Sequence, residues 1–500
     1  MKEDKDNKKN KRWLKPKQRV PAHFDELNAA FPTENVSKTL TPNLRALRMA
    51  MTASDLLLSM GVSANSVVSR ALDITEAYCD QPVTVTISYN LLTISQVRGI
   101  SDEPLTLIRP IPMRDINNMT VQAVQQLIYE IRKGQHTLDE AEAKLDNILN
   151  KPKAYPSWIP PLANAAIAPT VVLMFTTNWR VVLVTAILAI LVDRLLVGLA
   201  RQAMAPFFRQ VIASFFVTMS AAVIAWLARD HHIQFFEGMN PTTIVVGGIF
   251  LLISGLAFVG SVQDALEEYY LTATARLMRV VMLTAGIVVG ILIGLYTANK
   301  LGIDIAVSPD PLALAPLHFQ VIGGALAAAA YALATHTRLR AVIWTALLAG
   351  GALSIMYASR HLDISVIPAS GVAAGCVALV AALFSRLWRA PASGVIACGI
   401  LPLVPGLALY TSLMQLISYP PGDELFFRGV GTFTTGLATA LSIATGASFG
   451  YMLGRPLHRH LTYKRNLTPF AEYVRQQLHV DSKTARLVRL TKRIQPKDSK

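Results

Sequence analysis

The sequence predicts an all-α polytopic membrane protein of about ten transmembrane helices, arranged as a 5+5 inverted repeat, with a small α+β cytoplasmic domain at the N-terminus. Three observations predict this fold class: apolar segments between residues 160 and 454, a motif repeated within them, and alternating helix and strand patterns before them. Apolar residues make up 52% of the chain and charged residues only 16%, less charge than a soluble protein of this length carries.

The first 152 residues divide into two parts. Residues 1–40 are rich in lysine and poor in apolar side chains, so we expect a disordered basic arm. Residues 41–152 have the periodicity of a small α+β domain. Apolar residues at helical spacing predict four helices, over residues 44–58, 66–79, 121–133 and 138–149. Thr137 and Glu140 have the spacing of a capping box at the start of the last of these helices.

Three strands are predicted between the second and third helices of this domain. VTVTIS and LLTISQV alternate with period two around Tyr89-Asn90, which indicates a hairpin, and PLTLIRPIP is typical of a Pro-bounded edge strand. The domain contains His136 and scattered acids, but no paired carboxylates at helical spacing and no Gly-rich phosphate loop. We therefore interpret it as an accessory or gating domain rather than as an enzyme.

Ten apolar segments, most of them close to twenty residues long, follow the domain. They cover residues 162–177, 181–200, 211–228, 243–263, 280–296, 317–335, 341–358, 364–384, 392–417 and 430–453. A helix needs about 20 apolar residues to cross the hydrocarbon core, and in lipid every backbone polar group must be paired within its segment. Each segment therefore predicts a transmembrane helix, with five in residues 160–298 and five in residues 315–455.

The net charge of +15 lies mainly in the basic arm and in a basic tail over residues 456–500. Attraction to the anionic headgroups of the lipid bilayer explains this charge. No aromatic platform or nucleic-acid-binding fold accompanies it, so we expect no nucleic-acid partner. An even number of spans places both tails on one side, and the loops predicted on that side carry more arginine than the others. Both termini are therefore predicted to be cytoplasmic.

A motif recurs in the two halves of the membrane part. Residues 253–270 read ISGLAFVGSVQDALEEYY and residues 404–421 read VPGLALYTSLMQLISYPP. Without gaps, Gly255, Leu256, Ala257 and Ser261 match Gly406, Leu407, Ala408 and Ser412, and Asp264 falls opposite Gln415. Five spans separate the copies, so they cross the membrane in opposite directions.

Inverted repeats with helices interrupted at Gly or Pro are typical of secondary transporters, which bind substrate near the bilayer midplane where such helices unwind. Ser254-Gly255 and Pro405-Gly406 are the expected breaks. The alternative is that these small residues only allow helices to pack closely.

The chain resembles the threonine/serine exporter family of bacterial inner-membrane carriers over roughly residues 45–455. The resemblance rests on MGVSANSVVSRALDITEAYCDQPVTVTIS and GQHTLDEAEAKLDNIL before the first span, and on ISGLAFVGSVQDALEEYYLTATARLMR and ACGILPLVPGLALYTSLMQL within the membrane. It implies ten spans, a cytoplasmic N-terminal domain, and export of threonine and serine driven by the proton motive force. One departure is that the first copy has Ser254-Gly255 where the second has Pro405-Gly406.

Polar and ionisable residues inside spans are functional hypotheses by default. Asp264 could take up a proton or hold a substrate amino group, and the alternative is a solvated helix end paired with Arg276. Asp193 lies within an apolar segment beside Arg194, where local pairing is the alternative. The candidate substrate and ion pathway comprises Ser254, Gly255, Ser261, Gln263, Asp264, Glu267, Pro405, Gly406, Ser412, Gln415 and Asp193.

The sequence matches to catalytic and metal-binding motifs lack the structural context that such sites need. Gly446–Gly450 matches GxSxG, but it lies in a predicted membrane helix rather than in a strand-to-helix turn. His231-His232 offers too few ligands for zinc, the three cysteines have no metal-binding spacing, and no Walker A motif occurs. We therefore expect no catalytic site, metal or cofactor.

The leading hypothesis is a secondary transporter that exports small polar amino acids, threonine and serine, with protons as the coupling ion. A membrane channel, or a carrier for another small metabolite, is the alternative, and accumulation against a gradient separates carrier from channel. An intramembrane enzyme would need a nucleophile and a base at one depth. The sequence leaves the oligomeric state open, a homo-oligomer included.

Overall fold

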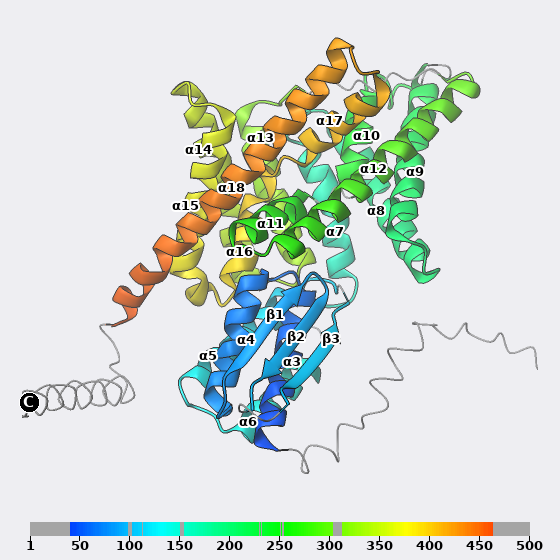
Figure 1. Ribbon diagram of the computed structural model, residues 1–500. Helices are drawn as coiled ribbons and strands as arrows, with labels where there is room; N and C mark the ends of the chain where they lie inside the picture. The colour runs from blue at the N-terminus through cyan, green and yellow to red at the C-terminus, as the bar shows by residue number, and fades with distance from the viewer. Residues whose placement is uncertain are drawn as a thin grey trace, which may run out of the picture.

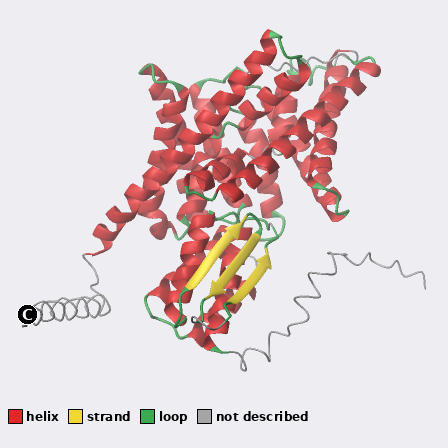
Figure 2. Ribbon diagram, viewed as in Figure 1, coloured by secondary structure: helices red, strands yellow, loops and turns green. Residues whose placement is uncertain are grey.

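The computed structural model describes residues 41–98, 103–112, 114–150, 155–229, 231, 233–250, 252, 255–303 and 313–463. An N-terminal domain lies against one end of a large helical part, below it in Figure 1. The predicted arm (1–40) and most of the predicted tail (456–500) fall outside the described residues. Figure 2 shows that the strands are confined to the N-terminal domain, within the part of the chain that is described.

The N-terminal domain packs four helices against a three-stranded antiparallel sheet of order β1-β2-β3. Its elements are α3 (Pro42–Ser59), α4 (Ala64–Tyr78), β1 (Val83–Ser88), β2 (Leu91–Gln96), β3 (Leu105–Pro110), α5 (Asn118–Arg132) and α6 (Leu138–Asn150). The hairpin lies where the period-two pattern placed it, with Ser88 opposite Leu91. One apolar cluster, which includes Leu47, Ile74 and Ile128, fills the space between the layers.

Turns and caps set the helix ends in this domain. Gly61 follows α3 with φ +85°, a left-handed conformation that costs glycine little. The predicted capping box is present: Thr137 N donates to Glu140 Oε2 at 3.1 Å and Glu140 N donates to Thr137 Oγ1 at 3.4 Å. Asn117 accepts bonds from the first turn of α5, so this helix begins earlier than the apolar pattern predicted.

The first half of the helical part contains six helices. They are α7 (Ile159–Val172), α8 (Trp179–Arg201), α9 (Pro206–Arg229), α10 (Pro241–Phe250), α11 (Gly255–Leu266) and α12 (Tyr270–Lys300). The second half contains α13 (Leu317–Ala334), α14 (Leu339–His361), α15 (Val366–Trp388), α16 (Ala392–Ile400), the 3₁₀ turn η2 (Leu401–Leu403), α17 (Gly406–Ser418) and α18 (Glu424–Tyr463).

Among the described residues, seven helices are long and apolar enough to cross a membrane, or up to nine if each of two bent pairs is one span. The chain is therefore a polytopic membrane protein, but the structure does not reach the predicted ten. The first predicted span is not among these nine, because α7 has only 14 residues and contains Pro169. The predicted ends of the last span were also wrong: α18 has 40 residues and runs from Glu424 to Tyr463. Hydropathy marks only the apolar stretch of a helix, not its polar ends.

The two halves of the helical part pack their helices in the same pairs. α7 contacts α8, and α9 contacts α12, as α13 contacts α14 and α15 contacts α18. α10 contacts α7, α8 and α9, as α16 contacts α13, α14 and α15. Across the halves, α7 meets α13, α12 meets α17, and α11 meets α18. Each of these first-half pairs thus has a second-half counterpart.

Small residues let the long helices approach closely. A Cβ atom at Gly294 in α12 would lie 2.7 Å from Thr218 Cβ in α9. A Cβ atom at Gly446 in α18 would overlap the backbone of Gly371 in α15, and one at Gly450 would overlap Gly375. The GxSxG match at Gly446–Gly450 is therefore a helix-packing feature, as its position predicted.

Candidate functional site

Two pairs of membrane helices are bent, and the second helix of each pair begins at the glycine that the sequence indicated. α10 and α11 are inclined at 52° to each other, and the α16–η2 segment is inclined at 50° to α17. Gly255 is the first residue of α11 and Gly406 the first of α17. Pro405 precedes α17 with ψ 41°, and its missing N–H and fixed ring prevent an unbroken helix. Ser254 lies outside the described residues.

The two breaks touch each other. A Cβ atom at Gly255 would lie 2.6 Å from Val404 Cγ1 and 3.5 Å from the Cα atom of Gly406. Gly255 and Gly406 are the aligned glycines of the repeated motif, so equivalent residues of the two copies meet at one point. Any larger side chain at Gly255 would displace Val404.

Helix ends meet at this contact. α11 and α17 begin there, and η2 ends just before it, at Leu403. Helix N-termini carry partial positive charge and C-termini partial negative charge. In Figure 1, α11 and α16 lie on the side of the N-terminal domain and α10 and α17 lie away from it.

The second part of each broken helix packs against both halves: α11 contacts α12 and α18, and α17 contacts α18 and α12. Phe258 of α11 packs in a buried cluster formed mainly by α15 and α18. Tyr410 and Met414 of α17 pack in a cluster formed mainly by α8, α9, α10 and α12. Each crossing segment therefore lies between its own half and the other half.

The aligned serines make the same hydrogen bond. Ser261 Oγ donates to Phe258 O at 2.7 Å, and Ser412 Oγ donates to Leu409 O at 2.9 Å. Both serines are buried. In this conformation their hydroxyl protons bond to the carbonyls of their own helices.

Asp264 lies at the end of α11 that faces the N-terminal domain. Its side chain is fully buried; Arg276 Nη1 donates to Oδ2 at 2.5 Å, and the backbone N–H of Ala64, at the start of α4, donates to Oδ1 at 3.3 Å. The pairing with Arg276 was the alternative that the sequence raised, but the pair is buried rather than solvated. Asp264 thus joins a membrane helix to the N-terminal domain.

Asp264 and Gln415, which the repeated motif aligns with each other, do not form one site. Asp264 and Gln415 each follow their glycine by nine residues, which at 1.5 Å per residue places each about 14 Å from the break. α11 and α17 run from the break toward opposite ends of the helical part (Figure 1). Gln415 is buried against α18, where a Cβ atom at Gly429 would lie 3.0 Å from its Cβ atom. Asp264 and Gln415 therefore lie on opposite sides of the contact between the breaks.

Three further predicted residues lie away from the contact between the breaks. Gln263 Nε2 donates to Glu267 Oε1 at 3.3 Å along α11. Asp193 in α8 accepts a bond from Asn164 Nδ2 of α7 at 3.1 Å and pairs with Arg194. Asp193 is buried, so it links two helices in addition to the local pairing that the sequence suggested.

The N-terminal domain docks on the membrane helices through bonds that the sequence reasoning missed. Asn118 Nδ2 donates to Thr335 Oγ1 at 3.1 Å and to Thr337 Oγ1 at 2.8 Å, and the backbone N–H of Asn118 donates to Thr335 O at 2.9 Å. The N–H of Tyr89, at the hairpin turn, donates to Thr272 Oγ1 at 3.1 Å. The pair Asn117-Asn118 before an amphipathic helix was the available signal, because Asn caps helices.

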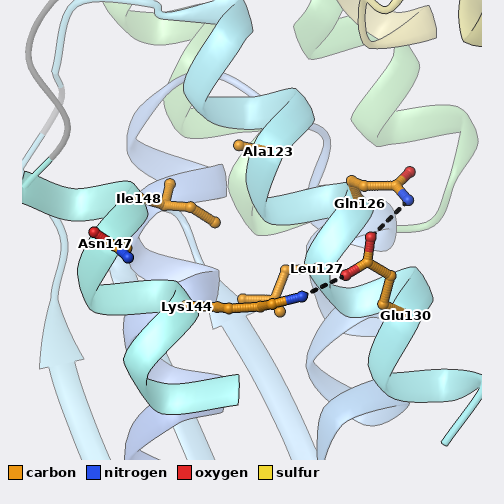
Figure 3. Close-up of a pocket in the computed structure, with 7 residues that line it drawn as sticks. All are labelled: Ala123, Gln126, Leu127, Glu130, Lys144, Asn147 and Ile148. Atoms are coloured by element: carbon orange, nitrogen blue, oxygen red, sulfur yellow. Dashed lines mark hydrogen bonds and ion pairs between the residues drawn. The ribbon is translucent and has the colours of Figure 1, made fainter. Parts of the chain in front are cut away.

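A cavity of about 240 Å³ lies in the N-terminal domain between α5 and α6 (Figure 3). Glu130 at its edge accepts bonds from Gln126 at 3.0 Å, His136 at 2.9 Å and Lys144 at 3.2 Å. These bonds, that from Gln126 first, lower the pKa of Glu130 to about 2. The cavity is remote from the breaks, and among the described residues no cluster of three His, Cys, Asp or Glu side chains could hold a metal ion.

Family models of threonine/serine exporters match both halves of the chain. The family model ThrE, described as "Putative threonine/serine exporter", matches residues 48–298, and ThrE_2, described as "Threonine/Serine exporter, ThrE", matches residues 320–453. No solved structure matches the chain.

Two curated proteins are similar over most of the chain. A "Probable threonine/serine exporter" of Mycobacterium tuberculosis is 30% identical over 420 residues, which cover 83% of this chain and 77% of that protein. A "Threonine/serine exporter" of Corynebacterium glutamicum is 27% identical over 420 residues, which cover 83% of each chain. Together with the broken membrane helices, these matches show that the chain belongs to the threonine/serine exporter family.

Proposed function

We propose that this protein exports threonine and serine across the bacterial inner membrane as a secondary transporter driven by the proton motive force. The contact between the two helix breaks carries the proposal. In secondary transporters, discontinuous helices from two inverted repeats meet near the bilayer midplane, and their unwound ends bind substrate and ions. The contact between Gly255 and Gly406, the first residues of α11 and α17, supports such an arrangement here.

The proposal includes a duplicated 5+5 architecture with ten spans. The proposal counts α7 as a short span and each bent pair as one broken span. The equivalent packing pairs of the two halves, and the equivalent contacts of α11 and α17 with both halves, favour descent from one five-helix unit. Rocking of one half against the other about the breaks would open the path alternately to each side.

The proposed substrates fit the chemistry of the contact. Threonine and serine are zwitterions, so their carboxylate suits the N-terminal ends of α11 and α17 and their ammonium group suits the C-terminal end of η2. The carbonyls of Val404 and Pro405 accept bonds from the N–H groups of Gly406 and Leu409, and the second lone pair of each carbonyl oxygen can accept a bond from the substrate hydroxyl. The hydroxyls of Ser261 and Ser412, one and a half turns farther along, become available only if they leave their carbonyls.

Proton coupling is proposed at Asp264. Its carboxylate lies at the end of the path nearest the N-terminal domain and is held by Arg276 and Ala64. Protonation would weaken both contacts and release α11 from the domain, which joins proton binding to movement of a broken helix. The proposal places both termini, and hence the N-terminal domain, in the cytoplasm.

Transport by the purified protein tests the proposal. Proteoliposomes loaded with labelled threonine should export it faster when an imposed proton gradient is present, and should accumulate it outside above its internal concentration. Serine should compete, whereas lysine should not. Movement that only equalises threonine on both sides would indicate a channel and contradict the proposal.

A further inference from the structure

A second pocket lies at the border between the N-terminal domain and the second half of the membrane helices. It has a volume of about 390 Å³ and belongs to neither the breaks nor the cavity of Figure 3. Its walls come from α5, from the chain before α7, from the turn that leads into α14, and from the end of α15. The residues are Met119, Tyr155, Arg338, Leu339, Arg340, Leu387, Trp388 and Arg389.

The charge of this pocket is entirely positive. Among the described residues, three arginines line it, and no aspartate or glutamate does. All three arginines are exposed, and with the described residues none of them forms a salt bridge. Clustered guanidinium groups repel one another unless an anion lies between them, and their planar forks match phosphate oxygens. The pocket is therefore suited to a phosphate group.

The surroundings of the pocket are those of a lipid site. Trp388 is buried and stacks on Trp344 and Phe384, with ring centroids 5.2 Å and 5.8 Å apart. Leu339 is 63% exposed and Leu387 79% exposed, at the ends of helices that cross the membrane. Aromatic side chains gather at the depth of lipid headgroups. A phosphate held by the arginines would thus have its acyl chains beside exposed apolar side chains.

We propose that this pocket binds the phosphate headgroup of an anionic phospholipid at the membrane face on which the N-terminal domain lies. The pocket adjoins the docking contacts of that domain: Tyr155 OH donates to Thr337 O at 2.7 Å, and Met119 follows Asn118, which bonds Thr335 and Thr337. The bound lipid bridges the N-terminal domain and α14–α15. Basic pockets between membrane helices bind such headgroups in other membrane proteins.

Lipid retention by the intact protein tests this site without measuring transport. The full chain is purified from vesicles of phosphatidylglycerol and phosphatidylcholine, and bound lipid is counted by native mass spectrometry. The variant Arg338→Gln/Arg389→Gln should retain phosphatidylglycerol about 30-fold more weakly, because each basic group near an anionic lipid contributes roughly fivefold. The matched control Arg201→Gln/Arg279→Gln removes two exposed arginines elsewhere and should retain it as the wild type does.

Two further arms keep the result interpretable. Arg338→Lys/Arg389→Lys keeps both charges and should retain most of the phosphatidylglycerol, so its success excludes misfolding as the cause of loss. Excess inorganic phosphate should not displace the lipid. Equal retention by the wild type and the glutamine variant would overturn the proposal, and displacement by inorganic phosphate would overturn it in favour of a soluble phosphate ligand.

Discussion

At the residue scale, single atoms decide whether the two halves can meet. Gly255 has no room for a side chain beside Val404, whereas nothing lies within 4 Å of a Cβ atom built on Gly260 in the same helix. The glycine of the motif is therefore required by a contact, not by helix flexibility alone. Asp264 has an equally specific place, because its two oxygens join Arg276 of α12 to Ala64 of the N-terminal domain.

Removal of the Asp264 carboxylate should separate its structural and coupling roles. Asp264→Asn leaves Arg276 buried without its counter-charge, and loss of one partner of a buried pair costs about 3–5 kcal/mol. The midpoint of thermal unfolding in detergent should fall, and Asp264→Asn/Arg276→Gln should recover part of the loss. Efflux by Asp264→Asn should no longer respond to the proton gradient. An unchanged response would leave Asp264 a structural link and make Asp193 the next candidate for coupling.

Glu130 should stabilise the N-terminal domain in a defined pH range. Its pKa is lowered from 4.5 to about 2 in the folded protein, so its contribution is full above pH 4.5 and is lost as pH falls from there toward 2. Hydrogen exchange of α5 and α6 in Glu130→Gln should be faster than in the wild type at pH 6. The difference should shrink below pH 4.5. The exposed Glu76→Gln is the control, and the same pH-dependent difference there would refute the assignment.

At the element scale, close packing of helices through small residues holds each half together. α9 packs on α12 and α15 on α18 with glycines at four-residue spacing, which place backbones in contact. In lipid there is little hydrophobic gain from joining apolar helices, so such close packing supplies much of their attraction. The crossing segments α11 and α17 then pack on these paired helices of the opposite half.

Substitution by alanine at Gly446 and at Gly431 of α18 should change the stability of the protein in opposite directions. A methyl group at Gly446 meets the backbone of Gly371, which cannot move aside, so Gly446→Ala should destabilise the protein by about 1–3 kcal/mol. Nothing lies within 4 Å of a Cβ atom at Gly431, where alanine gains up to about 1 kcal/mol of helix propensity. Thermal unfolding in detergent measures both. Equal midpoints would show that α15 and α18 are not in backbone contact.

At the scale of the whole molecule, the sequence was most informative about features that depend on neighbouring residues. The breaks at Gly255 and Gly406 were predicted because Gly and Pro act on their own helix, and the hairpin at Tyr89-Asn90 followed from alternation. Contacts between distant segments were not predicted. The bond from Ala64 to Asp264 joins residues 200 positions apart, and no local pattern encodes it.

The proposed orientation is open to a direct test of the intact chain. Both termini should be cytoplasmic, since the basic residues of the two ends favour that side. Alkaline phosphatase and green fluorescent protein are each fused after residue 150 and after residue 500. The phosphatase is active only outside the cytoplasm, and the fluorescent protein only inside it. Only the fluorescent fusions should be active. Phosphatase activity from either position would require a different number of spans.

The central claim is that the two helix breaks meet and that this contact forms the export path. A double-mutant cycle on threonine efflux from preloaded cells tests it most directly. Gly255→Ala should slow efflux because its methyl group meets Val404 Cγ1, and Gly260→Ala should not. Adding Val404→Ala removes that methyl and should restore efflux about fivefold or more, a coupling of about 1 kcal/mol. Independent losses from Gly255→Ala and Val404→Ala, or equal effects at Gly255 and Gly260, would contradict the account.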